Sequence, residues 1–179
     1  MTIPLQEITG PDGNLFIQGN GIAKEYSNAQ NSASSILENA LIKAKAENKH
    51  VFLKYSASWC GWCKKLDKEM KNDSCKSFFD TNYVIVTLVV NESEKNKHLE
   101  TPGAIDFLKK HKVDDYGLPV WVILDNTGVL IEDSLNAKGK NLGYPGKKKE
   151  VKSFITILKK TSNLTEENLN IIKEVFLLK

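Results

Sequence analysis

Two cysteines lie three residues apart in the segment Trp59-Cys60-Gly61-Trp62-Cys63-Lys64, and this spacing constrains the fold more than any other feature. The segment Val51–Tyr55 before it is mostly apolar and predicts a central strand. Residues 64–71 after it carry apolar side chains at helical spacing and predict a helix. The pattern therefore predicts a strand that delivers two thiols to the N-terminus of a helix.

A helix N-terminus favours negative charge, because its free backbone N–H groups and the helix dipole stabilise an anion there. We therefore expect a lowered pKa for the Cys60 thiol, a nucleophilic role for it, and greater exposure than Cys63. Cys63 lies about one helical turn away and could attack a mixed disulfide formed at Cys60. Cys63 is thus predicted to be the more buried, resolving thiol, and the pair predicts dithiol–disulfide exchange.

A structural or metal-binding cysteine pair is the alternative. Zinc sites normally need four ligands, and the chain has three cysteines and three histidines. Cys75 lies roughly three helical turns beyond Cys63, and the histidines show no ligand spacing. We expect no metal and no cofactor, and we expect Cys75 to be an unpaired, partly buried thiol.

The 179 residues fit one domain with some extension and can bury a core without disulfide staples. The net charge is only +3, and basic runs such as Lys147–Lys149 are interpreted as solvated faces. We therefore expect no nucleic-acid partner. No run of 18 apolar residues is present in the sequence, so no membrane span is expected.

Apolar periodicity and turn signals predict alternating helices and strands. Helices are predicted over residues 33–49, 64–71 (with a short second turn through 79), 101–112, around 151–158 and from 165, and strands over 15–17, 51–55, 83–90, 120–124 and 129–131. Residues 1–14 are predicted to be irregular. The alternation predicts parallel strands crossed by helices and finished by an antiparallel hairpin, which is an α/β sandwich with a mixed sheet.

The chain resembles the thioredoxin superfamily in its W-C-G-W-C-K motif, the strand before it, and Gly117-Leu118-Pro119 leading into strand 120–124. Members of that family carry a cis-proline facing the dithiol, and Pro119 stands in that place; an ordinary trans turn is the alternative. The resemblance implies a thioredoxin-like three-layer α/β/α sandwich with a central mixed sheet over residues 32–160. Residues 1–31 and 161–179 would then be an N-terminal extension and a C-terminal helical extension.

The likeness is closer to a bacterial branch of thioredoxin-like proteins, often exported and often described as disulfide isomerases. The matching residues are Lys43-Ala44, Asn48-Lys49, Ser58 to Cys63, Lys65-Leu66 and Glu69. The branch implies an exported, periplasmic protein whose signal peptide is absent from this sequence, with a cytoplasmic protein as the alternative.

Lys54 departs from the family pattern. Thioredoxins usually carry a buried aspartate six residues before the first cysteine, where it helps to move the proton of the second. A cation at Lys54 would instead favour the thiolate form of the dithiol, which makes it a candidate for tuning the thiol pKa. The alternative is that the Lys54 side chain simply extends to solvent. In either case the proton of Cys63 needs another route.

Five residues around the dithiol are candidates for substrate binding: Trp59, Gly61, Trp62, Leu118 and Pro119. Trp62 is predicted to be partly exposed and to contact apolar substrates, whereas Trp59 is predicted to pack under the loop. A cis bond at Pro119 would expose the backbone of Leu118 as an edge for an extended peptide.

These features predict a thiol–disulfide oxidoreductase of the reductase or isomerase type. Its expected partners are disulfide-containing or dithiol proteins and a redox partner that recycles the dithiol, and the protein is expected to be a monomer. The alternative is a redox-silent binding or chaperone module built on the thioredoxin fold, which the replacement of the acid by Lys54 would support.

Overall fold

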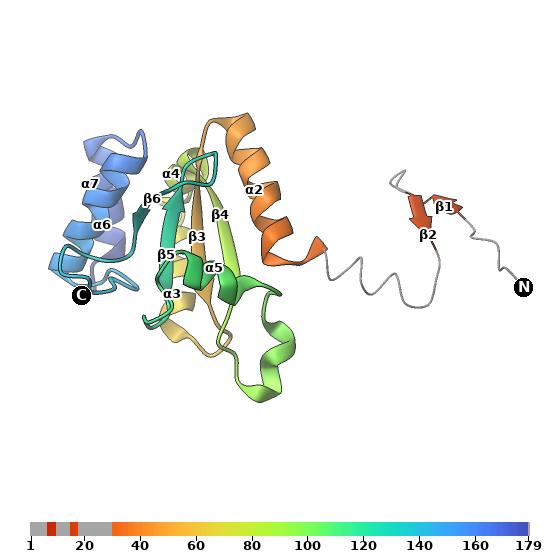
Figure 1. Ribbon diagram of the computed structural model, residues 1–179. Helices are drawn as coiled ribbons and strands as arrows, with labels where there is room; N and C mark the ends of the chain where they lie inside the picture. The colour runs from red at the N-terminus through yellow and green to blue at the C-terminus, as the bar shows by residue number, and fades with distance from the viewer. Residues whose placement is uncertain (1–6, 10–14, 18–29, 179) are drawn as a thin grey trace, which may run out of the picture.

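A four-stranded mixed sheet forms the centre of the protein in the computed structural model, which describes residues 7–9, 15–17 and 30–178 (Figure 1). The strand order is β4-β3-β5-β6. Strand β3 (His50–Ser56) pairs in parallel with β4 (Tyr83–Val89) and antiparallel with β5 (Val120–Leu124). Strand β6 (Leu130–Asp133) then pairs antiparallel with β5 at the edge.

Helices cover both faces of this sheet and complete the predicted three-layer α/β/α sandwich (Figure 1). One face carries α2 (Ala33–Glu47) and α5 (Ala104–Lys110). The other carries α3 (Gly61–Met70), α4 (Lys76–Asn82), α6 (Lys148–Thr161) and α7 (Glu166–Phe176). A short 3₁₀ helix, η1 (Glu94–Leu99), lies between β4 and α5 and was not predicted.

The two cores arise because successive side chains of a strand point to opposite faces. Phe52 of β3 packs with Trp121 and Ile123 in the core under α3, α4, α6 and α7. Its neighbours Val51 and Leu53 belong to the core under α2 and α5. Strand β3 is buried along both faces, which explains its nearly continuous apolar sequence.

The direction of β5 differs from the prediction of parallel strands, because β5 runs antiparallel to β3. Helix α5 begins only at Ala104, after Gly103 in the left-handed region (φ 78°), and has 7 residues. Val120 pairs with Tyr55 near the end of β3, so β5 starts at the end of the sheet where β3 and β4 finish.

Helix α7 lies beyond residue 160, yet its apolar side chains complete the core of the domain. Leu169, Ile172 and Phe176 are buried in the same cluster as Phe52 and Trp121. Thr165 caps the helix by accepting a hydrogen bond from the Asn168 backbone N–H.

Two short strands are described in the N-terminal part of the chain. Strand β1 (Glu7–Thr9) pairs antiparallel with β2 (Leu15–Ile17). The prediction for β2 is confirmed, whereas the irregular structure predicted for residues 1–14 is wrong at 7–9. The other residues of the predicted N-terminal extension up to 29 lie outside the described residues.

Candidate functional site

Cys60 and Cys63 form a disulfide at the start of α3, with their Cα atoms 5.3 Å apart. Cys60 is the N-cap of this helix, with an extended backbone conformation (φ −80°, ψ 97°). Its Sγ accepts a hydrogen bond of 3.1 Å from the Cys63 backbone N–H. The strand–thiol–helix arrangement predicted from the sequence is therefore present, and one free N–H of the first helical turn points at the sulfur of Cys60.

Cys60 is only marginally more exposed than Cys63, and neither sulfur has the open position expected for a nucleophile. Cys60 and Cys63 expose 3% and 2% of their surface, and both pack with Ala57 and the partly buried Leu118. The disulfide and the capping hydrogen bond draw the Cys60 sulfur back over the first turn of α3, where Leu118 contacts the cluster.

The loop that carries Pro119 faces the disulfide. The Leu118–Pro119 peptide bond is cis, and Pro119 lines one narrow crevice together with Cys63. Asn141, which the sequence did not single out, holds this loop through its side-chain amide. Its Nδ2 donates to the backbone oxygens of Gly117 (2.7 Å) and Pro119 (3.0 Å). These bonds join segments 22 and 24 residues apart, so no local sequence pattern indicates them.

Lys54 does not extend to solvent, so that interpretation is wrong. Its side chain exposes only 5% of its surface and forms an ion pair with Asp67 of α3. Lys54 and Asp67 line the same crevice as Cys63 and Pro119. The acid absent from β3 is therefore supplied by α3, four residues after Cys63. Asp67 was missed because only the tertiary fold brings it to Lys54.

The two tryptophans beside the cysteines are both exposed. Trp62 exposes 54% of its surface, as predicted, and its ring stacks on Tyr144 at 5.6 Å between centroids. Trp59 exposes 58%, so its predicted packing under the loop is wrong; its indole N–H donates to the Asn91 backbone oxygen at 2.9 Å. Gly61 is exposed, and a Cβ atom added there would meet no atom within 4 Å apart from its neighbours in the chain.

A buried carboxylate holds the segment that leads into Cys60. Glu92, 5% exposed, accepts hydrogen bonds from the backbone N–H and the hydroxyl of Ser58, the latter at 2.7 Å. The Glu92 N–H in turn donates to Glu100 at 2.8 Å. Glu92 follows the end of β4, beside the end of β3, so it fixes the cysteine loop against the sheet.

The third cysteine, Cys75, packs in the main core and not in the cluster around Cys60 and Cys63. Cys75 is free and fully buried, more deeply than predicted, and its Sγ donates to the Glu69 backbone oxygen at 3.0 Å. Burial raises the pKa of its thiol to about 11, so it stays protonated near neutral pH. Across the described residues, no three histidine, cysteine or acidic side chains gather in a way that could hold a metal ion. None of the helices described is long and apolar enough to cross a bilayer.

A family model described as thioredoxin-like matches residues 32–126, more than half of the chain and including both cysteines. The chain belongs to this thioredoxin-like family. Similar solved structures include a disulphide isomerase from Xylella fastidiosa Temecula1, 22% identical, covering 56% of this chain and 72% of that one with a TM-score of 0.46. The oxidised C-terminal domain of DsbD from Neisseria meningitidis is 18% identical, covering 73% and 97% of the two chains with a TM-score of 0.46. No curated protein sequence matches the chain significantly.

Proposed function

We propose that this protein is a thiol–disulfide oxidoreductase of the reductase or isomerase type, acting on protein substrates through Cys60 and Cys63. The observation that carries the proposal is the Cys60–Cys63 disulfide at the tip of α3, with the cis-proline loop packed against it. Family membership supports the same chemistry, because it places this cysteine pair within the matched thioredoxin-like segment.

Cys60 is the proposed nucleophile because it is the N-cap of α3. The hydrogen bond from the Cys63 N–H to the Cys60 sulfur would be made to a thiolate in the reduced protein. A hydrogen bond to the charged form, together with the positive end of the helix dipole, favours ionisation of the thiol. The more ionised thiol is the better attacking group near neutral pH.

The proposed reaction reduces one substrate disulfide and forms one protein disulfide. The Cys60 thiolate attacks a substrate sulfur, a Cys60–substrate disulfide forms, and the other substrate sulfur leaves as a thiolate. Cys63 then loses its proton and attacks Cys60, which releases the second substrate thiolate and leaves the Cys60–Cys63 bond. Two electrons pass to the substrate, and a redox partner must return two electrons to start the next cycle.

Lys54 and Asp67 are the proposed route for the Cys63 proton. Both line the crevice that Cys63 faces, and the Asp67 side chain is 34% exposed. The Asp67 carboxylate would take the proton and pass it to solvent, while the Lys54 ammonium would stabilise the Cys63 thiolate. Together they would do the work of the aspartate that thioredoxins carry on the strand.

The substrate would bind across the exposed residues that surround the buried sulfurs. Trp59, Gly61 and Trp62 offer an open surface around the cysteine loop. On the other side, Leu118 and Pro119 would pair with an extended peptide through the Leu118 backbone. Because both sulfurs are covered, attack requires that the substrate or a small movement of the Leu118 loop opens access to Cys60.

Reduction of insulin by dithiothreitol tests the activity. The native protein should accelerate the reduction, and Cys60→Ser should not. Cys63→Ser should retain the first step and accumulate a mixed disulfide with the substrate, visible by mass spectrometry. Equal rates for the native protein and Cys60→Ser would refute the proposal.

The direction of exchange depends on the reduction potential against the compartment. Equilibration of the Cys60–Cys63 couple in glutathione buffers should give a value between that of thioredoxin, about −270 mV, and that of protein disulfide isomerase, about −180 mV, and below that of the strong oxidant DsbA, about −120 mV. The proposed setting is an exported, monomeric protein with a dedicated electron donor; a cytoplasmic protein would instead act as a general reductase.

The near-complete burial of both sulfurs favours a second candidate, a redox-silent binding or chaperone module. In that case the native protein and Cys60→Ser would protect an unfolding client from aggregation equally well, and neither would accelerate insulin reduction.

A further inference from the structure

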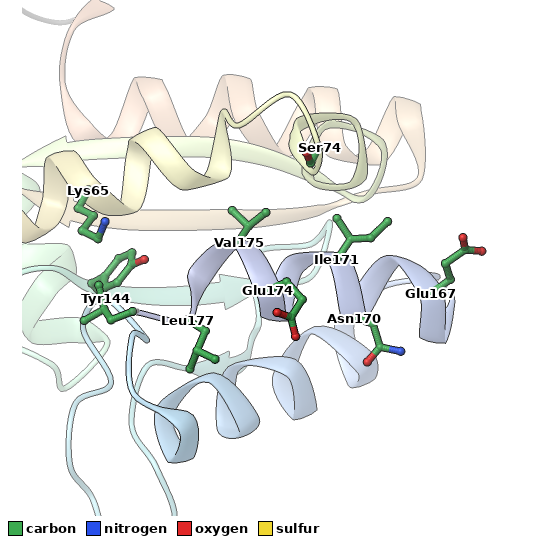
Figure 2. Close-up of a pocket in the computed structure, with 10 residues that line it drawn as sticks. Lys65, Ser74, Tyr144, Glu167, Asn170, Ile171, Glu174, Val175 and Leu177 are labelled. Carbon is green, nitrogen blue, oxygen red and sulfur yellow. The ribbon is translucent and has the colours of Figure 1, made fainter.

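A groove of about 1050 Å³ runs between α3 and α7, on the face of the sheet that carries the disulfide helix (Figure 2). Lys65 and Tyr144 lie at one end of it, and Glu167 lies at the other (Figure 2). Ile171 and Val175 point from α7 toward the α3 side (Figure 2). Helix α7 therefore does more than fill the core, because its other side forms one wall of an open groove.

This groove begins beside the cysteines. A smaller cleft of about 270 Å³ is lined by Trp62, Leu118 and Pro119, and it shares Tyr144 and Leu178 with the groove. The Tyr144 ring stacks on Trp62, one of the two residues between the cysteines. A chain lying beside Pro119 could thus continue past Tyr144 into the groove without leaving the surface.

The groove has an apolar wall and a negative rim. Ile171 and Val175 are only partly buried, while Glu167 and Glu174 are exposed and form no ion pair within residues 30–178. The positive charge of Lys65 is already neutralised, because its ammonium contacts Glu69 at 3.3 Å. The charge left for a ligand is therefore negative, and the ligand it complements is basic.

We propose that the groove binds an extended segment of the substrate protein next to its reactive cysteine, a segment in which apolar and basic side chains alternate. The inference rests on the proposed oxidoreductase function and names the substrate class for that site. The part of α7 from Glu167 to Phe176 spans about 15 Å, the length of about four extended residues. Successive side chains of an extended segment point to opposite sides, so its apolar side chains would lie against Ile171 and Val175 and its basic side chains would point toward Glu167 and Glu174.

Three substrates test the proposal at low salt: glutathione disulfide, and two peptides whose single cysteine is joined to glutathione and flanked on both sides by Leu-Lys-Leu-Lys or by Leu-Glu-Leu-Glu. The native protein should reduce the lysine peptide at least about threefold faster than the glutamate peptide, measured as kcat/KM. The double variant Glu167→Lys/Glu174→Lys should abolish or reverse this preference. Glutathione disulfide, whose single residue on either side of the cysteine is too short to enter the groove, should react equally with both proteins.

The matched control is Glu38→Lys/Asp106→Lys, which makes the same charge change at two exposed positions on α2 and α5, across the sheet. It should keep the native preference. Equal turnover of the two peptides, or a preference that survives the α7 variant, would overturn the groove proposal while the proposed function stands. Failure to reduce any of the three substrates would overturn the proposed function and the groove's role with it.

Discussion

Replacing Phe176 with alanine should destabilise the whole domain, because this residue joins α7 to the main core. Phe176 is fully buried, and its ring centroid lies 5.1 Å from that of Phe154, 5.8 Å from Tyr144 and 6.1 Å from Phe79. Truncating a buried phenylalanine to alanine costs about 3–5 kcal/mol, since the removed ring leaves a cavity. That is a large share of a typical total stability of about 5–15 kcal/mol.

Urea unfolding followed by tryptophan fluorescence measures this loss. Trp121 is fully buried in the same core as Phe176, so it reports on the packing that the substitution removes. With a slope of about 2 kcal/mol per molar urea, the midpoint should fall by about 1.5–2.5 M. Ile42→Ala is the control: Ile42 lies on α2 and is 63% exposed, so its loss should change stability by about 0.5 kcal/mol or less.

A loss below about 1 kcal/mol in Phe176→Ala would contradict this reasoning, because it falls well short of the usual cost of such a cavity. So would an unchanged midpoint after deletion of residues 162–179. Either result would mean that α7 is a separable appendage and that the core closes without Leu169, Ile172 and Phe176.

Three further predictions follow from buried groups. Burial lowers the pKa of His111, so the fold favours its neutral form. The free energy of unfolding should therefore fall as the pH drops through the ordinary histidine range near about 6.5. Urea midpoints measured between about pH 7.5 and 5 should depend less on pH in His111→Gln than in the native protein. With its pKa raised to about 11 and no exposed surface, Cys75 should resist iodoacetamide in the folded, reduced protein and react only in urea. Asp67→Asn should lower the free energy of unfolding by about 3–5 kcal/mol, because it leaves the Lys54 charge buried without a partner. Lys54→Met leaves a carboxylate that is 34% exposed, so in the same urea assay it should lower the free energy of unfolding by only about 1 kcal/mol.

The local features of the site could be predicted from the sequence because they depend on neighbouring residues. The apolar run of β3, the cysteine pair at the start of α3 and Pro119 before β5 all have signals within a few residues. The start of α7 follows from its cap Thr165 and from apolar spacing. A resemblance to thioredoxins could then be stated from these motifs alone.

The predictions that proved wrong concern side chains whose exposure depends on contacts with distant residues. Trp59 is exposed because its indole N–H binds Asn91, a residue 32 positions later. Lys54 is buried because Asp67 reaches it from the next helix. Neither partner can be identified from the residues on either side, since side-chain pairing of this kind has no short-range periodicity.

By itself, the sequence determined that two thiols stand one turn apart at a helix tip, because strand, turn and helix propensities act over a few residues. Only the tertiary structure decided that β5 runs back along β3, that Leu118 packs against the two cysteines, and that Tyr144 and α7 extend the site into a groove. The physical reason is that these arrangements are set by burial and packing among segments tens of residues apart, which take effect only when the sheet has formed.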